Sequence, residues 1–369
     1  MRAAVFYGKG DIRVDEVPVP TCGPADLLLE VHAVGICGTD AHEFASGPHM
    51  FPIYERHPVS GHVGPMIPGH ELTGIIREVG GEVRGFETGE LVVSGAGISC
   101  GHCVQCRRGR TNLCENYSTV GLQRHGALAQ YVVVPAAICL KVAPYGISQD
   151  TAALAQPMSI AVHAMRRGRL ADGDQAVIVG AGGIGAFLTF AAAHEVDQVA
   201  VLDVNAERLK IAADLGATHV LETDASSDPK AAIAEWGMDP TVIYEVSGTP
   251  AGLRTAASLL PKGGRLVLVG LQGAPAEWDL RTLSLVEHEL IGTNAHVCAV
   301  DLPRSLELLA RRDTPWSDIA PVALSLDELV TDGIQPLVER RSARIKTLID
   351  PWTARTRPVD MVATGEVAS

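Results

Sequence analysis

The stretch "VIVGAGGIGAFL", residues 177–188, decides the fold class of this chain. It places Gly180, Gly182 and Gly185 at the spacing G-x-G-x-x-G, after an apolar strand and at the start of a helix. Glycine at the first position permits a tight turn, at the second lets the backbone approach a pyrophosphate, and at the third lets the helix pack on the strand. The motif therefore predicts a site for a dinucleotide coenzyme.

The residues around this motif indicate which coenzyme binds. Gly183 and Ile184 begin the helix, where backbone amides are expected to face an anion. Asp203 ends the next strand, and a carboxylate there accepts hydrogen bonds from the ribose hydroxyls and repels a 2′-phosphate. No Arg or Lys follows in "DVNAE", so NAD is favoured over NADP. The alternative is a glycine-rich turn of another α/β fold, with Asp203 as a helix N-cap.

Apolar strands alternate with helices on both sides of the motif, from about residue 174 to 294. The predicted strands are "QAVIVG", "QVAVLD", "THVLE", "TVIYEVSG", "GRLVLVG" and "HELIGTN". Six strands with crossover helices predict a doubly wound parallel sheet, a Rossmann domain over residues 151–294.

The rest of the chain has a different pattern. Residues 1–150 contain short strands punctuated by Gly and Pro, which predicts a mostly β domain. The strand "RIKTLIDP", residues 344–351, is expected to return to it, so that residues 295–369 complete this domain. The tail, residues 355–369, lacks periodicity and is expected to fray.

The composition limits the possible partners. A formal charge of −13 would repel phosphate backbones and anionic lipid, which argues against nucleic acid and membrane partners. The first residues resemble neither a signal peptide nor a transit peptide, and no apolar run reaches about 18 residues. A cytoplasmic enzyme is therefore expected.

Four cysteines form a compact metal-binding pattern. The spacing C-x2-C-x2-C-x7-C involves Cys100, Cys103, Cys106 and Cys114. Four thiolates close a tetrahedral shell and leave no open position, so they predict a structural zinc site. An iron–sulfur cluster is the alternative, although nothing else in the sequence suggests electron transfer.

A second set of candidate ligands is dispersed along the chain. Cys37 lies in "GICGTDAHE", His70 in "GHELTG", and Gln156 near the start of a helical stretch. A catalytic zinc ion needs three protein ligands and one open position for substrate. A ligating His also needs a carboxylate on its other nitrogen, and Asp40 and Glu71 are placed to serve.

Taken together, these motifs resemble the zinc-dependent medium-chain dehydrogenase/reductase family of alcohol and polyol dehydrogenases. The family signature G-H-E-x2-G-x5-G stands here as "GHELTGIIREVG", residues 69–80, and the resemblance covers nearly the whole chain. It implies that the first domain is a GroES-like β fold, interrupted by the coenzyme domain. Residues 43–65 are similar to an insertion in the butanediol/sorbitol dehydrogenase branch.

The resemblance also implies roles for residues near the expected catalytic zinc. Cys37 and His70 would be ligands, and Asp40 would orient His70. Thr39 would hydrogen-bond the substrate alcohol, and His42 would be the outer end of a proton relay.

Further roles follow from the same resemblance. Glu71 would lie near the zinc, as a neighbour or an occasional ligand. Lys346 matches the basic residue that meets the coenzyme pyrophosphate. His49, His57 and His62 lie in the insertion and are expected to be loop residues.

The sequence departs from the family at Gln156. The polyol branch has E-P-x5-H-A, whereas this chain has "QPMSIAVHA", residues 156–164. With Cys37, His70 and a Glu, the zinc site has formal charge zero, and with Gln156 the charge is +1 unless Glu71 restores neutrality. Coordination by Gln156, by Glu71 or by water in that position all stay open.

The implied activity is hydride transfer between a secondary alcohol, vicinal diol or polyol and NAD, with one catalytic and one structural zinc ion. A homodimer or homotetramer is expected. The alternatives are a zinc-poor NAD(P)H reductase of the same fold and a coenzyme-binding protein without turnover.

Overall fold

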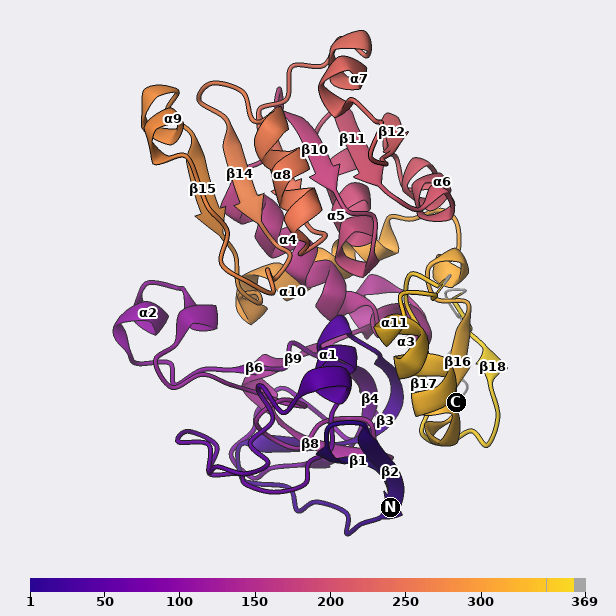
Figure 1. Cartoon of the computed structure of the whole chain (residues 1–369). Coiled ribbons are helices and arrows are strands. Elements are labelled where there is room, and N and C mark those ends of the chain that lie inside the picture. The colour runs from indigo at the N-terminus through magenta and orange to yellow at the C-terminus, as the bar shows by residue number, and fades with distance from the viewer. Residues whose placement is uncertain (343, 362–369) are drawn as a thin grey trace. The chain divides into compact units, whose positions relative to one another are not determined.

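The computed structural model describes residues 1–342 and 344–361, which form two compact units (Figure 1). The first unit comprises residues 1–159 and the chain from residue 296 onward, and the second comprises residues 160–295. The limits predicted from the sequence lie at 150/151 and 294/295. These limits stay a prediction. One helix, α4 (Ala155–Gly168), includes the division after residue 159.

The second unit contains a six-stranded sheet with the order β12-β11-β10-β13-β14-β15, in which every neighbouring pair is parallel (Figure 1). Its strands are β10 (Gln175–Val179), β11 (Gln198–Asp203), β12 (His219–Glu222), β13 (Val242–Glu245), β14 (Arg265–Leu268) and β15 (Glu289–Gly292). The strand order reverses between β10 and β13, which is where doubly wound sheets bind ligands. The predicted Rossmann fold is confirmed.

Except for the helix that begins after Gly182, the helices that connect the strands of this sheet start at a residue whose side chain caps them. They are α5 (Gly183–Ala193), α6 (Ala206–Asp214), α7 (Pro229–Glu235), α8 (Pro250–Leu259) and α9 (Leu280–Leu285). Asn205 caps α6 by accepting from the Arg208 amide, and Thr249 caps α8 in the same way. The central strands β10 and β13 are almost entirely buried, because helices of a doubly wound fold cover both faces.

The first unit is built on an eight-stranded sheet with the order β18-β16-β17-β3-β4-β5-β9, in which β8 also pairs with β3. Its strands are β3 (Asp26–Gly35), β4 (Glu71–Val79), β5 (Leu91–Ser94), β8 (Tyr131–Pro135), β9 (Cys139–Lys141), β16 (Val322–Leu324), β17 (Leu348–Ile349) and β18 (Arg357–Pro358). Because β17 pairs antiparallel with β3, the predicted return of the C-terminal segment to the first domain is confirmed.

Smaller elements complete this unit. Two short ladders join β1 (Arg2–Gly8) to β2 (Asp11–Glu16) and β6 (Gly97–Ile98) to β7 (Ser118–Thr119). The helices are α1 (Gly38–Ser46), α2 (Val104–Arg107), α3 (Gln149–Ala152), α10 (Cys298–Ala310) and α11 (Gln335–Val338). Within the described part of the chain, none of the helices combines the length and the apolar character that crossing a bilayer requires.

The predicted fraying of residues 355–369 is wrong for residues 355–361. There, β18 pairs antiparallel with β16, and Arg357 reaches the buried carboxylate of Asp150. The polar partners lie far away in the sequence, so periodicity could not reveal them. Residues 362–369 lie outside the described residues.

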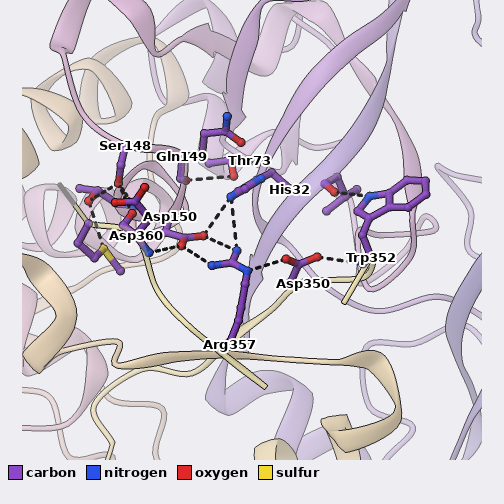
Figure 2. A network of polar contacts seen from close by, with 12 residues as sticks. His32, Thr73, Ser148, Gln149, Asp150, Asp350, Trp352, Arg357 and Asp360 are labelled. Atoms are coloured by element: carbon purple, nitrogen blue, oxygen red, sulfur yellow. Dashed lines mark hydrogen bonds and ion pairs between the residues drawn. The ribbon is translucent and has the colours of Figure 1, made fainter. Parts of the chain in front are cut away.

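Asp150 is the centre of the network in Figure 2. Its oxygens accept hydrogen bonds from Arg357 at 2.7 and 2.9 Å and from the Asp360 amide at 2.7 Å, and His32 Nε2 lies 3.1 Å away. Burial alone would raise the pKa of Asp150, but these partners hold it well below its usual range. Arg357 also donates to Asp350 at 2.7 Å. The network therefore ties the C-terminal segment to β3 and α3.

We expect Arg357→Met to lower the stability of the first unit by about 3 kcal/mol at pH 7, because it leaves a buried carboxylate without its main partner. A carboxyl whose pKa is depressed by folding stabilises the protein above its unfolded pKa and loses that effect as pH falls. The difference between wild type and variant should therefore shrink below about pH 4. Thermal unfolding across pH measures both effects.

Arg355→Met is the matched control, since Arg355 is exposed and lies two residues away in the same segment. Equal losses in the two variants, or a loss for Arg357→Met that does not change with pH, would contradict this account of Asp150.

Candidate functional site

The four predicted zinc cysteines converge in a lobe around α2, which projects from the sheet of the first unit (Figure 1). The ligand atoms of Cys100, Cys103, Cys106 and Cys114 all lie within 4.8 Å of one another. The Cys103 and Cys114 sulfur atoms are 3.9 Å apart. Four thiolates at the usual Zn–S distance in a tetrahedron would have their sulfurs about 3.8 Å apart. The arrangement therefore fits a zinc ion.

Backbone amides donate hydrogen bonds to the sulfur atoms of this cluster and so stabilise their thiolate forms. The Cys103 amide donates to Cys100 Sγ at 3.3 Å, and the Cys100 and Asn116 amides donate to Cys114 Sγ at 3.2 and 3.3 Å. Donors from the His102 and Cys103 backbone lower the pKa of Cys100 to about 6, whereas burial raises the pKa of Cys114 to about 11. A dication supplies the positive charge that ionising all four thiols requires.

The second candidate cluster joins Cys37, His70 and Glu71, whose ligand atoms also lie within 4.8 Å of one another. Cys37 is the N-cap of α1, and its amide donates to Asp40 Oδ2 at 2.9 Å. His70 directly precedes β4, and Glu71 is the first residue of that strand. The cluster is therefore built from the ends of regular elements.

Gly35 makes room for this cluster. It pairs with Glu71 across β3 and β4, and a Cβ atom on Gly35 would collide with the Glu71 carboxylate. Only a residue without a side chain fits here. The sequence alone carries no signal for this requirement, because Glu71 lies on a different strand from Gly35.

The buried polar atoms around the cluster that lack a hydrogen-bond partner among the described residues include Asp40 Oδ1 and His70 Nδ1. These two atoms lie 4.0 Å apart, which is beyond hydrogen-bonding distance. Burial disfavours a charged His70, but the Cys37 sulfur, Asp40 and Glu71 outweigh burial and raise the pKa of His70 to about 9. This concentration of negative charge around an imidazole fits a site for a cation.

Lys346 has a partner that the sequence did not predict. Its ammonium lies 2.5 Å from Glu71 Oε2 and donates to the Ile36 carbonyl at 2.9 Å. Both side chains are buried, with Lys346 6% and Glu71 1% exposed. Burial would lower the pKa of Lys346, but Glu71 outweighs it and the pKa is raised. A contact between Lys346 and the coenzyme pyrophosphate stays a prediction.

The structure places the other predicted catalytic residues in the same unit. Thr39 Oγ1 lies 3.7 Å from Cys37 Sγ. His42 is exposed on α1, and its ring stacks on His49. Gln156 is buried in the first turn of α4, and its role as a ligand stays a prediction.

In the second unit, the glycine motif has the backbone geometry that a pyrophosphate site needs. Gly180 has a φ of 111°, and a Cβ atom there would lie 2.8 Å from the Ser247 amide. A Cβ atom on Gly185 would collide with the Gly180 carbonyl. At Gly182, in contrast, a Cβ atom would enter open space. This open position fits the close approach of a ligand to the backbone.

The start of α5 and Asp203 complete this site. Gly182 caps α5 without a side-chain hydrogen bond, and Gly183 and Ile184 form the first turn, so the amides there are available to an anion. Asp203 Oδ2 accepts from the Ala181 amide at 2.6 Å. The alternative role of Asp203 as a helix N-cap is wrong, because the N-cap of α6 is Asn205.

Comparison with known proteins agrees with this geometry. Residues 23–144 match the family model described as alcohol dehydrogenase GroES-like domain, and residues 183–311 match zinc-binding dehydrogenase. Sorbitol dehydrogenase of Bacillus subtilis (strain 168) is 30% identical over 356 residues, covering 95% of this chain and 97% of that protein.

Two further dehydrogenases are similar to this chain, one in sequence and one in structure. L-threonine 3-dehydrogenase of Shewanella woodyi is 36% identical over 270 residues, covering 72% of this chain and 75% of that protein. The crystal structure of 2R,3R-butanediol dehydrogenase from Bacillus subtilis superimposes with a TM-score of 0.86 at 28% identity, covering 95% of this chain and 99% of that one.

The predicted family and fold class are therefore confirmed. With its GroES-like and Rossmann domains, its tetracysteine zinc site and its Cys37, His70 and Glu71 cluster, the chain belongs to the zinc-containing medium-chain alcohol dehydrogenase family.

Proposed function

We propose that this protein transfers a hydride between a secondary alcohol, vicinal diol or polyol and NAD, using one catalytic and one structural zinc ion. The observation that carries this proposal is the convergence of Cys37, His70 and Glu71 in one largely buried cluster. The names of the relatives support the substrate class. Sorbitol, butanediol and threonine each contain a secondary alcohol next to a carbon that bears a hydroxyl or amino group.

The side chains of α1 supply a path for the alcohol proton. A zinc ion held by Cys37 and His70 would supply a Lewis acid for the alcohol oxygen, and NAD would supply the hydride acceptor. Thr39, beside Cys37, would accept the proton at its hydroxyl oxygen and pass its own proton through the nicotinamide ribose to His42. Thr39 and His42 are three residues apart on α1 and therefore share one face of the helix. His42 is exposed and can release the proton to solvent.

Besides Cys37 and His70, the catalytic zinc ion needs a third protein ligand, and the candidates are Gln156 and Glu71. Lys346 holds Glu71 and compensates its charge, so Lys346 competes with a metal ion for this carboxylate. We therefore propose Gln156, buried near the start of α4, as the third ligand, with Glu71 as the alternative. Asp40 would orient His70 after a small movement from the present 4.0 Å.

NAD is the proposed coenzyme because Asp203 presents a carboxylate at the end of β11 whose position is set by backbone amides. Its two oxygens accept from the Ala181 amide at 2.6 Å and the Asn205 amide at 2.9 Å. A 2′-phosphate beside this fixed carboxylate would bring two anions together. Assembly into a homodimer or homotetramer stays a prediction, for which the edge strand β15, with Leu290 exposed, provides a surface.

Metal analysis and a substrate panel test the proposed function. We expect two zinc ions per chain and NAD-dependent oxidation of at least one diol, polyol or other secondary alcohol. NAD should exceed NADP more than about tenfold in kcat/KM, and Asp203→Asn should narrow this gap. Asn is preferred to Ala because it keeps one acceptor oxygen for the glycine turn. One zinc ion per chain without alcohol turnover would instead support a zinc-poor reductase or a binding protein.

Cys103→Ser should reduce stability more than chemistry, because it opens the closed tetrathiolate shell and removes the folding energy coupled to zinc. We expect a lower melting temperature and the loss of about one zinc ion per chain. Cys22→Ser is the control, since Cys22 lies outside both clusters. A Cys103→Ser protein with full zinc content and the wild-type melting temperature would refute the structural role.

Gln156→Glu tests the third ligand. If Gln156 binds the catalytic zinc, the substitution adds a negative charge to the site and should raise resistance to a chelator by about tenfold. The tetracysteine zinc serves as the internal reference in the same release experiment. If Gln156→Glu leaves release unchanged and Glu71→Gln accelerates it, Glu71 is the ligand.

A further inference from the structure

His42 has an aromatic neighbour that the proton path described above does not use. The ring of His49 lies parallel to that of His42, with centroids 4.5 Å apart and an angle of 17° between the planes. From the sequence, His49 is expected to be a loop residue, and it does lie outside regular structure. Its contacts, however, fix its position.

The backbone around His49 is tied to α1 by a buried carboxylate. Glu43, which is fully buried, accepts from the His49 amide at 2.9 Å and from the Met50 amide at 2.7 Å. The Gly47 amide donates to the Glu43 carbonyl at 2.8 Å. The chain after α1 is therefore folded back onto the last turn of that helix, which sets His49 beside His42.

Ser46 anchors the edge of the His49 ring. Its hydroxyl donates to the His42 carbonyl at 3.0 Å, because a carbonyl oxygen can only accept. The contact of 2.8 Å between Ser46 Oγ and His49 Nε2 must then be donated by an Nε2–H group. With its edge held by Ser46, the His49 ring presents its face to His42.

We propose that His49 is a positioning residue for the proton relay, holding the His42 imidazole in one orientation by ring stacking. This inference rests on the proposed dehydrogenase function, in which His42 releases the alcohol proton to solvent. An exposed side chain without such a neighbour samples three staggered χ1 wells, and only part of that population would face Thr39. Stacking on His49 holds the His42 ring in one orientation before proton transfer. Less of the activation free energy is then spent on ordering that ring.

Steady-state kinetics of the full-length, zinc-loaded enzyme provide the first test. We expect His49→Ala to lower kcat about threefold or more and to leave the KM for NAD unchanged. The factor of about three arises because the His42 side chain would then spread over three χ1 wells instead of one. His49→Phe, which still offers a ring face, should keep kcat within about twofold of wild type. His62→Ala is the matched control, because His62 lies in the same insertion but makes an edge-to-face contact with His125, at 78° between the ring planes.

A double-mutant cycle separates positioning from a general structural effect. In a His42→Ala background, His49→Ala should cause no further loss of kcat, because no ring remains to be positioned. The same fractional loss in both backgrounds, or a His49→Phe variant as slow as His49→Ala, would overturn the proposal. Equal kcat values for wild type and His49→Ala would overturn it as well.

NMR of histidine ring protons gives a readout that does not depend on turnover. The His42 resonance, assigned by its absence in His42→Ala, should carry a ring-current shift from His49 that disappears in His49→Ala and persists in His49→Phe. If that shift is absent, the stacking is wrong even when the dehydrogenase is active. If the shift is present but no alcohol is oxidised, it is the proposed function that fails, and the relay role of the stack fails with it.

Discussion

The buried ion pair between Lys346 and Glu71 is the interaction on which the catalytic unit depends. It joins a residue near the end of the chain to the first residue of β4, and neither side chain has access to bulk water. Removing one member would leave an unpaired charge in the interior, which typically costs about 3–5 kcal/mol. Lys346 lies just before β17 and Glu71 begins β4, and the strand order β17-β3-β4 brings these two charges together. The sheet register and the ion pair therefore support each other.

The parts of this protein that could be predicted from sequence are those whose chemistry is local. The glycine motif predicts its own turn because Gly180 needs a positive φ and Gly182 needs open space, and both needs are visible in consecutive residues. The four zinc cysteines lie within one short segment, so their spacing alone implies a closed shell.

The contacts that sequence did not predict depend on register and on loop conformation. Arg357 meets Asp150, and Lys346 meets Glu71, only because the C-terminal strands add to the sheet begun by β3. His49 meets His42 because one buried carboxylate, Glu43, turns the chain after α1. No sequence motif defines the spacing of these pairs. Each contact can be recognised only once the path of the backbone is known.

The charges around the second cluster bear on the neutral amide of Gln156, which we propose as the third zinc ligand. Cys37 as thiolate, Asp40 and Glu71 contribute three negative charges, and the Lys346 ammonium offsets one of them, which leaves a zinc ion balanced when His70 is neutral. A glutamate in place of Gln156 would have the zinc ion as its cationic partner, because the Lys346 ammonium already faces Glu71. With Gln156 as the proposed third ligand, the formal charges of Cys37, Asp40, Glu71, Lys346 and a zinc ion would sum to zero without a further carboxylate.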